Sequence, residues 1–115
     1  MSTLKSELKI LTELLEELKV LSSTVYTVKN NAALTDHIIL VTVSNSIHCN
    51  AVVDSLSKCF KSEFKESDAF FSPPRSSGSS ESGWIILDAN SIVIHVLLDE
   101  LNDYYQLDKL FESMT

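Results

Sequence analysis

Residues 84–98, WIILDANSIVIHVLL, decide the fold that this sequence predicts. Two apolar runs rich in Ile and Val flank the short polar segment 88–91, which is typical of two strands joined by a tight turn. A turn centred on Ala89 and Asn90 would place Trp84 opposite His95. The stretch therefore predicts an antiparallel hairpin with this register.

The two faces of the predicted hairpin differ in chemistry. Because side chains alternate along a strand, one face carries only aliphatic residues and is expected to be core. These residues are Ile85, Leu87, Ile92, Ile94, Val96 and Leu98. The opposite face carries Trp84, Ile86, Asp88, Val93 and His95. A face that served only as core would not require Trp, His and Asp, so it is the candidate functional surface.

The rest of the chain alternates between helix and strand. Leucines at helical spacing predict an amphipathic helix over residues 4–21. Further elements are predicted as strands at 25–28, 38–43 and 68–71, a turn at 30–31, and helices at 46–64 and 99–113. The helix at 46–64 is expected to be capped by Ser44 or Ser46 and to bury Ile47, Ala51, Val52, Leu56, Cys59 and Phe60.

Segment 72–83, SPPRSSGSSESG, interrupts this alternation with two prolines and six serines. It has nothing to bury and is predicted to be a mobile surface loop. Together the elements predict one α/β domain over residues 1–115, with a mixed sheet of about five strands flanked by helices and at least one βα crossover.

The composition limits the classes of partner. A net charge of −7, with nine basic residues scattered among sixteen acidic ones, argues against a nucleic-acid-binding surface. An acidic protein is instead suited to a basic protein partner. No targeting segment is recognisable, and the longest apolar runs fall short of the ~20 residues of a membrane span.

The two cysteines indicate a reducing compartment. Cys49 and Cys59 lie ten residues apart on one predicted helix. The helical rise separates them by ~15 Å, too far for a disulfide. Both are expected to be reduced core thiols of a cytoplasmic protein.

Three blocks of the sequence resemble the Iojap/RsfS family of ribosomal silencing factors. The first is the hairpin pattern Trp-apolar-apolar-Leu-Asp, a turn, and apolar-Val-apolar-His-Val. The second is segment 104–111, YYQLDKLF. The third comprises Asp36, Thr42, Ser44, His48, Ala51 and Asp54. The resemblance runs from about residue 11 to the end of the chain.

This resemblance implies a fold related to nucleotidyltransferases and a function in translation. The family binds the large ribosomal subunit through ribosomal protein L-fourteen and sterically blocks joining of the small subunit, and its members are often dimeric when free. The resemblance implies that the partner-binding residues are Trp84, Leu87, Asp88 and His95. Val93 lies on the same predicted face as Trp84, Asp88 and His95 and is added to them. Strand alternation places Leu87 on the opposite face.

The sequence departs from the family pattern at four places. Val43 stands where the family has Gly, and Ile47 where it has Arg. Asn90-Ser91 replaces a Gly-Asp turn, and Phe111 replaces a Trp. The missing Arg removes a possible charged contact with the partner.

An enzyme is the first alternative. Nucleotidyltransferase chemistry needs paired carboxylates for metal ions, but the chain has no Asp-x-Asp, and its only two glycines leave no phosphate-binding loop. His37, His48 and Cys49 lack the spacing of a zinc site. We therefore expect no catalytic residue, metal or cofactor. A Ser-His-Asp triad stays open as an alternative, because its members need not be adjacent in the sequence.

Two further interpretations stay open. Trp84 and His95 could simply belong to the core, hydrogen-bonded to each other or to backbone. The domain could also be a self-associating adaptor, because exposed apolar strand faces drive dimerisation as well as partner binding.

Overall fold

The computed structural model describes residues 4–28 and 35–115. In these residues the elements are α1 (Lys5–Glu17), β1 (Ser22–Thr27), β2 (His37–Val43), α2 (Ser46–Glu63), β3 (Arg75–Ser79), β4 (Trp84–Asp88), β5 (Ile92–Leu98), α3 (Asp99–Tyr105) and α4 (Leu107–Glu112). The strands form one sheet in the order β1-β2-β5-β4-β3, in which β2 and β5 are parallel and the other pairs antiparallel. The predicted fold class is confirmed.

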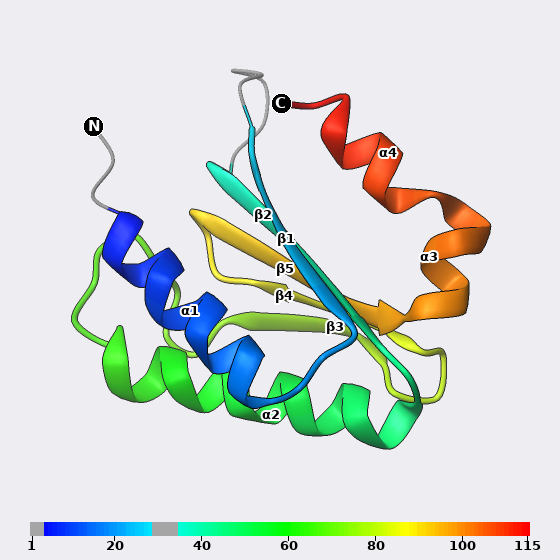
Figure 1. Ribbon diagram of the computed structural model, residues 1–115. Helices are drawn as coiled ribbons and strands as arrows, with labels where there is room; N and C mark the ends of the chain where they lie inside the picture. Colours follow the sequence, from blue (N-terminus) through cyan, green and yellow to red (C-terminus); the bar gives the residue numbers. More distant parts are fainter. Residues whose placement is uncertain (1–3, 29–34) are drawn as a thin grey trace.

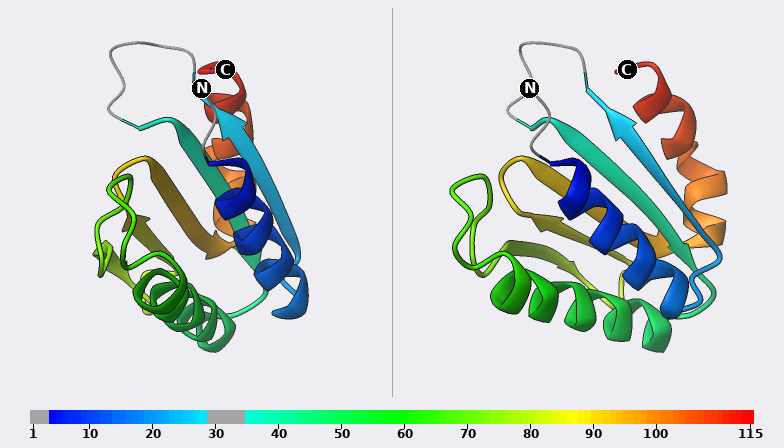
Figure 2. Two further views of the ribbon diagram at one scale, coloured as in Figure 1. Left: turned by 90° about the vertical axis from the view of Figure 1, so that its left-hand side faces the viewer. Right: turned by 60° about the vertical axis from the view of Figure 1, so that its left-hand side comes forward.

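The helices lie on both faces of the sheet. Helices α1 and α2 lie side by side on one face, whereas α3 and α4 lie on the other (Figures 1 and 2). After β2 and α2, the chain forms the antiparallel pair β3 and β4. Strand β5 follows and lies between β4 and β2. This position places the predicted hairpin in the middle of the sheet.

The main core lies between the sheet and α1 and α2. The aliphatic hairpin face predicted to be core is buried there, with Leu87, Ile92, Ile94 and Val96 each at 0% exposure. Helix α2 also follows its predicted bounds closely, but its cap is Asn45, whose side chain accepts a hydrogen bond from the His48 amide at 2.8 Å.

The buried face of α2 was predicted only in part. Ile47 is 83% exposed and Ala51 is also exposed, whereas Cys49 and Val53 are buried instead. Ile47 lies in the first turn, and its side chain projects away from the core. Both cysteines are buried and free, as expected.

The hairpin register differs from the prediction by two residues. Trp84 pairs with Leu97, and Ile86 pairs with His95. The turn is centred one residue later, because Asn90 adopts the left-handed conformation at φ 76° while Ala89 is buried. A shift of two residues keeps every side chain on its predicted face.

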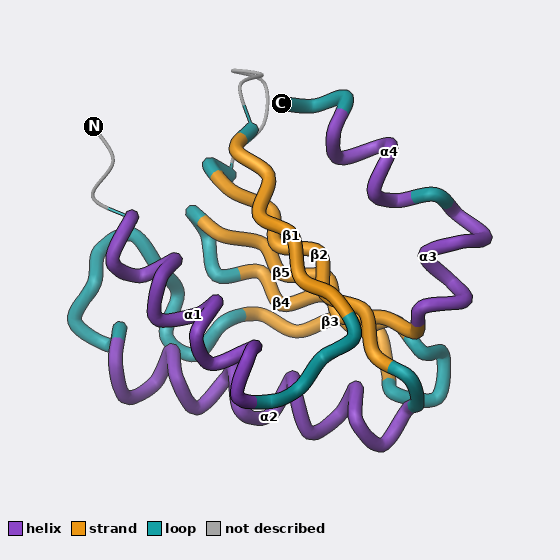
Figure 3. Tube along the Cα trace, viewed as in Figure 1, coloured by secondary structure: helices purple, strands orange, loops and turns teal. Residues whose placement is uncertain are grey.

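The third predicted strand was placed in the wrong segment. Residues 68–71 form no strand; Phe70 is buried against Phe60 and Phe64. The predicted loop over 72–83 instead contains β3, an edge strand whose five residues are all exposed (Figure 3). Backbone pairing to β4, which requires no side-chain burial, holds this strand.

Two helices end earlier than predicted. Helix α1 ends at Glu17, and Lys19 adopts a left-handed conformation at φ 57° before β1 begins. The predicted helix over 99–113 is divided at Gln106, which has φ 54°. The predicted turn at 30–31 lies outside the described residues.

Candidate partner-binding surface

The sheet face opposite α1 and α2 is only partly covered. Helices α3 and α4 bury a second cluster over β1, β2 and β5, composed of Tyr26, Ile38, Leu40, Leu97, Leu107 and Phe111. Beyond this cluster, no helix within residues 4–28 and 35–115 covers β4 and β3 to a comparable extent (Figure 2), and α3 reaches β4 only with Leu101 and Tyr105 beside Trp84. The open half of the face therefore begins at Trp84 and His95.

Trp84 and His95 are joined by a hydrogen bond. The indole Nε1–H donates to His95 Nδ1 at 3.1 Å, between diagonal positions of β4 and β5. Because Nδ1 accepts this bond, the neutral ring carries its proton on Nε2. Both side chains are half-buried, so they are neither sealed in the core nor fully in solvent.

Burial keeps His95 neutral. Desolvation lowers the pKa of His95 from 6.5 to about 4. At neutral pH the imidazole is therefore uncharged, and it can sit against aromatic rings without the cost of a buried charge. This surface is apolar with polar edges rather than cationic.

A continuous row of aromatic rings crosses this face. The ring of Phe111 lies 5.8 Å from that of Tyr26 and 4.9 Å from that of His95. On the other side of His95, Trp84 lies 5.6 Å from Tyr105. Tyr105 in turn contacts Tyr104 edge-on at 4.8 Å. The row runs from the covered cluster into solvent, where Tyr104 is 78% exposed and Tyr105 is 53% exposed.

A hollow of about 350 Å³ lies beside Trp84, and we call it the Trp84 hollow. It is lined by Gly78, Ser82, Trp84, Ile86, Leu101 and Tyr105. Gly78 is required at its edge, because a Cβ there would lie 2.2 Å from the Trp84 carbonyl oxygen, and the residue has φ +89°. The hollow is large enough to receive one or two apolar side chains.

A second hollow, of about 270 Å³, lies at the other end of β4 and is called the Asp88 hollow. Its lining residues are Thr35, Phe71, Arg75, Asp88, Asn90 and Val93. The Arg75 guanidinium lies 4.3 Å from the centre of the Phe71 ring. One Asp88 oxygen accepts the Asn90 amide at 3.0 Å and so shapes the turn. The hollow thus offers a cation and a carboxylate side by side.

The structure brings together four of the five predicted site residues. Trp84, Asp88, Val93 and His95 lie on this face, and all four are half-buried. Leu87 is the exception, because its side chain lies on the opposite face, in the core, and is 0% exposed. A partner cannot reach Leu87 in the folded domain, so its assignment to partner binding is corrected to a core role.

Sequence reasoning missed three residues of this surface. Tyr105 and Leu101 reach the Trp84 hollow only because α3 folds back over the sheet, which no local pattern indicated. Arg75 was assigned to a structureless loop. One signal was available, since the aromatic pair at 104–105 was already part of the resembling block.

In residues 4–28 and 35–115, no group of three or more His, Cys, Asp or Glu side chains is arranged to hold a metal ion. Among the helices in those ranges, none has both the length and the apolar character needed to span a bilayer.

Comparison with known proteins identifies the family. A family model described as "Ribosomal silencing factor during starvation" matches residues 2–115. The chain belongs to this family. The resemblance seen in the three sequence blocks is therefore confirmed.

Two curated relatives extend this finding. The ribosomal silencing factor RsfS of Haemophilus influenzae is 26% identical over 104 residues, covering 90% of this chain and 95% of the relative. The mouse protein named mitochondrial assembly of ribosomal large subunit protein 1 is 27% identical over 107 residues. That match covers 93% of this chain but 46% of the mouse protein.

Solved structures share the fold. A protein of Chromobacterium violaceum has a TM-score of 0.74 at 24% identity, covering 90% of this chain and 81% of that chain. A protein of Bacillus halodurans has a TM-score of 0.72 at 20% identity, covering 92% and 93%. These likenesses support the α/β architecture described above.

Proposed function

We propose that this protein binds the large ribosomal subunit through the open half-face that contains Trp84 and His95. Bound there, it blocks joining of the small subunit and so represses translation in the cytoplasm. The observation that carries this proposal is the half-buried aromatic row beside the Trp84 hollow, in a chain of the ribosomal silencing factor family. Aromatic anchors beside a preformed hollow are typical of interface hot spots.

The charge around this surface favours a basic protein as the direct partner. Asp99, Glu100 and Asp103 are exposed on α3, next to the Trp84 hollow, and α3 carries no basic residue. An acidic rim around an apolar centre speeds encounter with a basic surface and disfavours RNA phosphates. By family resemblance, we propose ribosomal protein L-fourteen as this partner.

The mechanism requires occupancy and no chemistry. A patch of ~800 Å² on each partner is enough for specific binding. The domain is 35 × 31 × 23 Å, so a bound copy would project well beyond such a patch. Its bulk would then prevent close approach of the small subunit.

A subunit-joining assay tests this proposal. Purified protein is added to isolated large and small subunits, and the fraction that reassociates is measured by gradient sedimentation. We expect the wild-type protein to lower reassociation, and Trp84→Ala to abolish the effect while keeping the fold. Leu21→Ala is the control, because it truncates an apolar side chain that is 56% exposed and precedes β1, three strands away from β4.

Two results would contradict the proposal. Undiminished inhibition by Trp84→Ala would show that another surface binds the subunit. Normal reassociation in the presence of wild-type protein would remove the steric mechanism.

Sedimentation of the free protein at several concentrations tests the alternative of a self-associating adaptor. A dimer that buries Trp84 and dissociates in Trp84→Ala would show that the same surface also joins two copies.

A further inference from the structure

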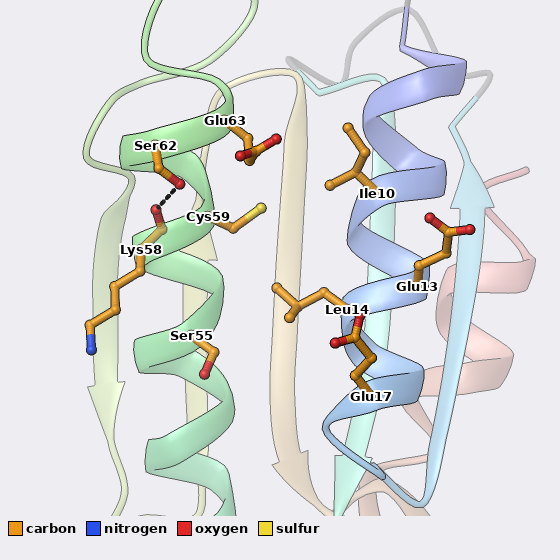
Figure 4. A pocket seen from close by; sticks show the side chains of 9 residues that line it. All are labelled: Ile10, Glu13, Leu14, Glu17, Ser55, Lys58, Cys59, Ser62 and Glu63. Atoms are coloured by element: carbon orange, nitrogen blue, oxygen red, sulfur yellow. Dashed lines mark hydrogen bonds between the residues drawn. The ribbon is translucent and has the colours of Figure 1, made fainter.

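The groove between α1 and α2 lies on the opposite side of the sheet from Trp84. The two helices run antiparallel there, and each contributes one stripe of side chains at helical spacing (Figure 4). The space between them is about 350 Å³. The partner-binding surface proposed above does not use this groove.

The bottom of the groove is apolar. Ile10 and Leu14 point from α1 into the space between the helices, and Cys59 faces them from α2 (Figure 4). Cys59 is 8% exposed, whereas Ile10 is 36% exposed and remains open to solvent. Ile10 therefore leaves apolar area in the groove that no described segment of this chain covers.

The sides of the groove are acidic. Glu13 and Glu17 line it from α1, and Glu63 lines it from α2. Its one basic lining residue is Lys58, whose ammonium lies 3.1 Å from the Asp54 carboxylate on the same helix. The groove thus combines an apolar bottom with net negative sides.

We propose that the α1–α2 groove binds a basic segment of another protein that inserts apolar side chains between flanking Lys or Arg residues. Apolar anchors at helical spacing match a groove of this kind, and charge complementarity selects a basic segment. A second copy of this chain is a poor occupant, since each copy has a net charge of −7 and would bring the same acidic sides. RNA and anionic lipid are repelled for the same reason.

This inference stands apart from the proposed function, because the two surfaces are on opposite faces of the sheet. One domain could therefore hold the ribosomal subunit and a second, basic protein at the same time.

A synthetic amphipathic lysine–leucine peptide is the probe. It is compared with a glutamate–leucine peptide and a lysine–serine peptide, and binding is followed by amide NMR shifts of the full chain. We expect only the lysine–leucine peptide to bind, with shifts concentrated at Ile10, Leu14 and Cys59. The double substitution Glu13→Lys with Glu17→Lys should weaken binding by about tenfold or more.

The matched control is Glu16→Lys with Glu66→Lys. It changes net charge equally at exposed residues that do not line the groove, and it should retain affinity within about twofold. Trp84→Ala should leave peptide binding unchanged, which separates this test from that of the subunit-binding surface.

Three outcomes would overturn the proposal. Equal weakening by both double variants would show attraction to overall charge alone. Shifts concentrated around Trp84 would place the binding on the other face. A dimer of the free protein that dissociates in an Ile10→Asp variant would show that a second copy occupies the groove through its apolar bottom.

Discussion

The two faces of the central sheet show how one hairpin serves both folding and binding. On the face beneath α1 and α2, every hairpin residue from 85 to 96 that points inward is at most 5% exposed. On the other face, Trp84, Ile86, Val93 and His95 remain half-buried, because α3 reaches β4 only through Leu101 and Tyr105 beside Trp84. The difference lies less in the strands than in the helices that cover them.

Neighbouring residues of β4 show this difference most sharply. Leu87 has 0% exposure, whereas Ile86, one position earlier, lines the Trp84 hollow. One residue contributes to the free energy of folding and the other to the surface that we assign to a partner. Substitutions on the two faces should therefore have separable effects.

The largest expected effect comes from truncating Leu87. Leu87→Ala leaves a cavity in the core and should lower the free energy of unfolding by about 2–5 kcal/mol, measured by urea denaturation. Ile86→Ala should cost about 1 kcal/mol, since the side chain is already partly in solvent, but should weaken subunit binding. Equal destabilisation by the two variants would contradict the division into a core face and a binding face.

His95 should make stability depend on pH. Its folded pKa of about 4 lies below its ordinary value of 6.5, so the unfolded chain takes up the proton first. The stabilisation is complete above pH 6.5 and is lost as pH falls from about 6.5 to about 4, by up to about 3 kcal/mol. Denaturation midpoints across this range would measure it, with His95→Gln as the reference. Parallel pH profiles for the two proteins would show that the imidazole is not desolvated.

Gly78 should be needed to keep the β3 edge beside the Trp84 hollow. Gly78→Ala adds a Cβ against the Trp84 carbonyl at a positive φ and should cost about 2 kcal/mol. Amide hydrogen exchange should accelerate along β3 and β4. Ser77→Ala, an exposed neighbour on the same strand, is the control and should change stability by less than about 0.5 kcal/mol. Unchanged exchange in Gly78→Ala would mean that the strand edge tolerates the added methyl group.

Asp88 should have the smallest effect on folding. Asp88→Ala removes the acceptor for the Asn90 amide and should cost about 1 kcal/mol. Asp88→Asn retains an oxygen at that position and should recover most of the stability, measured in the same denaturation experiment. If Asn recovers stability but not subunit binding, the carboxylate charge itself contacts the partner. A full loss of stability in both variants would show a structural role beyond the turn.

The sequence predicted the sheet faces well because alternation depends only on local geometry. Trp84 and His95 were placed on one face even though their register was wrong by two residues. The error arose at the turn, where Asn90 rather than Ala89 takes the left-handed conformation. A register shift of two residues leaves every side chain on the same face, so the alternation of apolar and polar residues does not reveal it.

Features that depend on backbone pairing or on long-range packing were not predictable. Strand β3 has no buried side chain, so the serine-rich segment gave no strand signal. Phe70 contributed to the wrong prediction of a strand at 68–71, because its burial comes from contacts with Phe60 and Phe64 and not from a place in the sheet. The Trp84 hollow exists because Tyr105 and Leu101 come back over β4 after the sheet is complete.

Amide hydrogen exchange of the protein, free and bound to large ribosomal subunits, tests the central claim most directly. The account predicts slower exchange on binding along β3, β4 and α3, around the Trp84 hollow, with Trp84→Ala removing this protection. Protection confined to α1 and α2, or none at all in a complex that still forms, would contradict it.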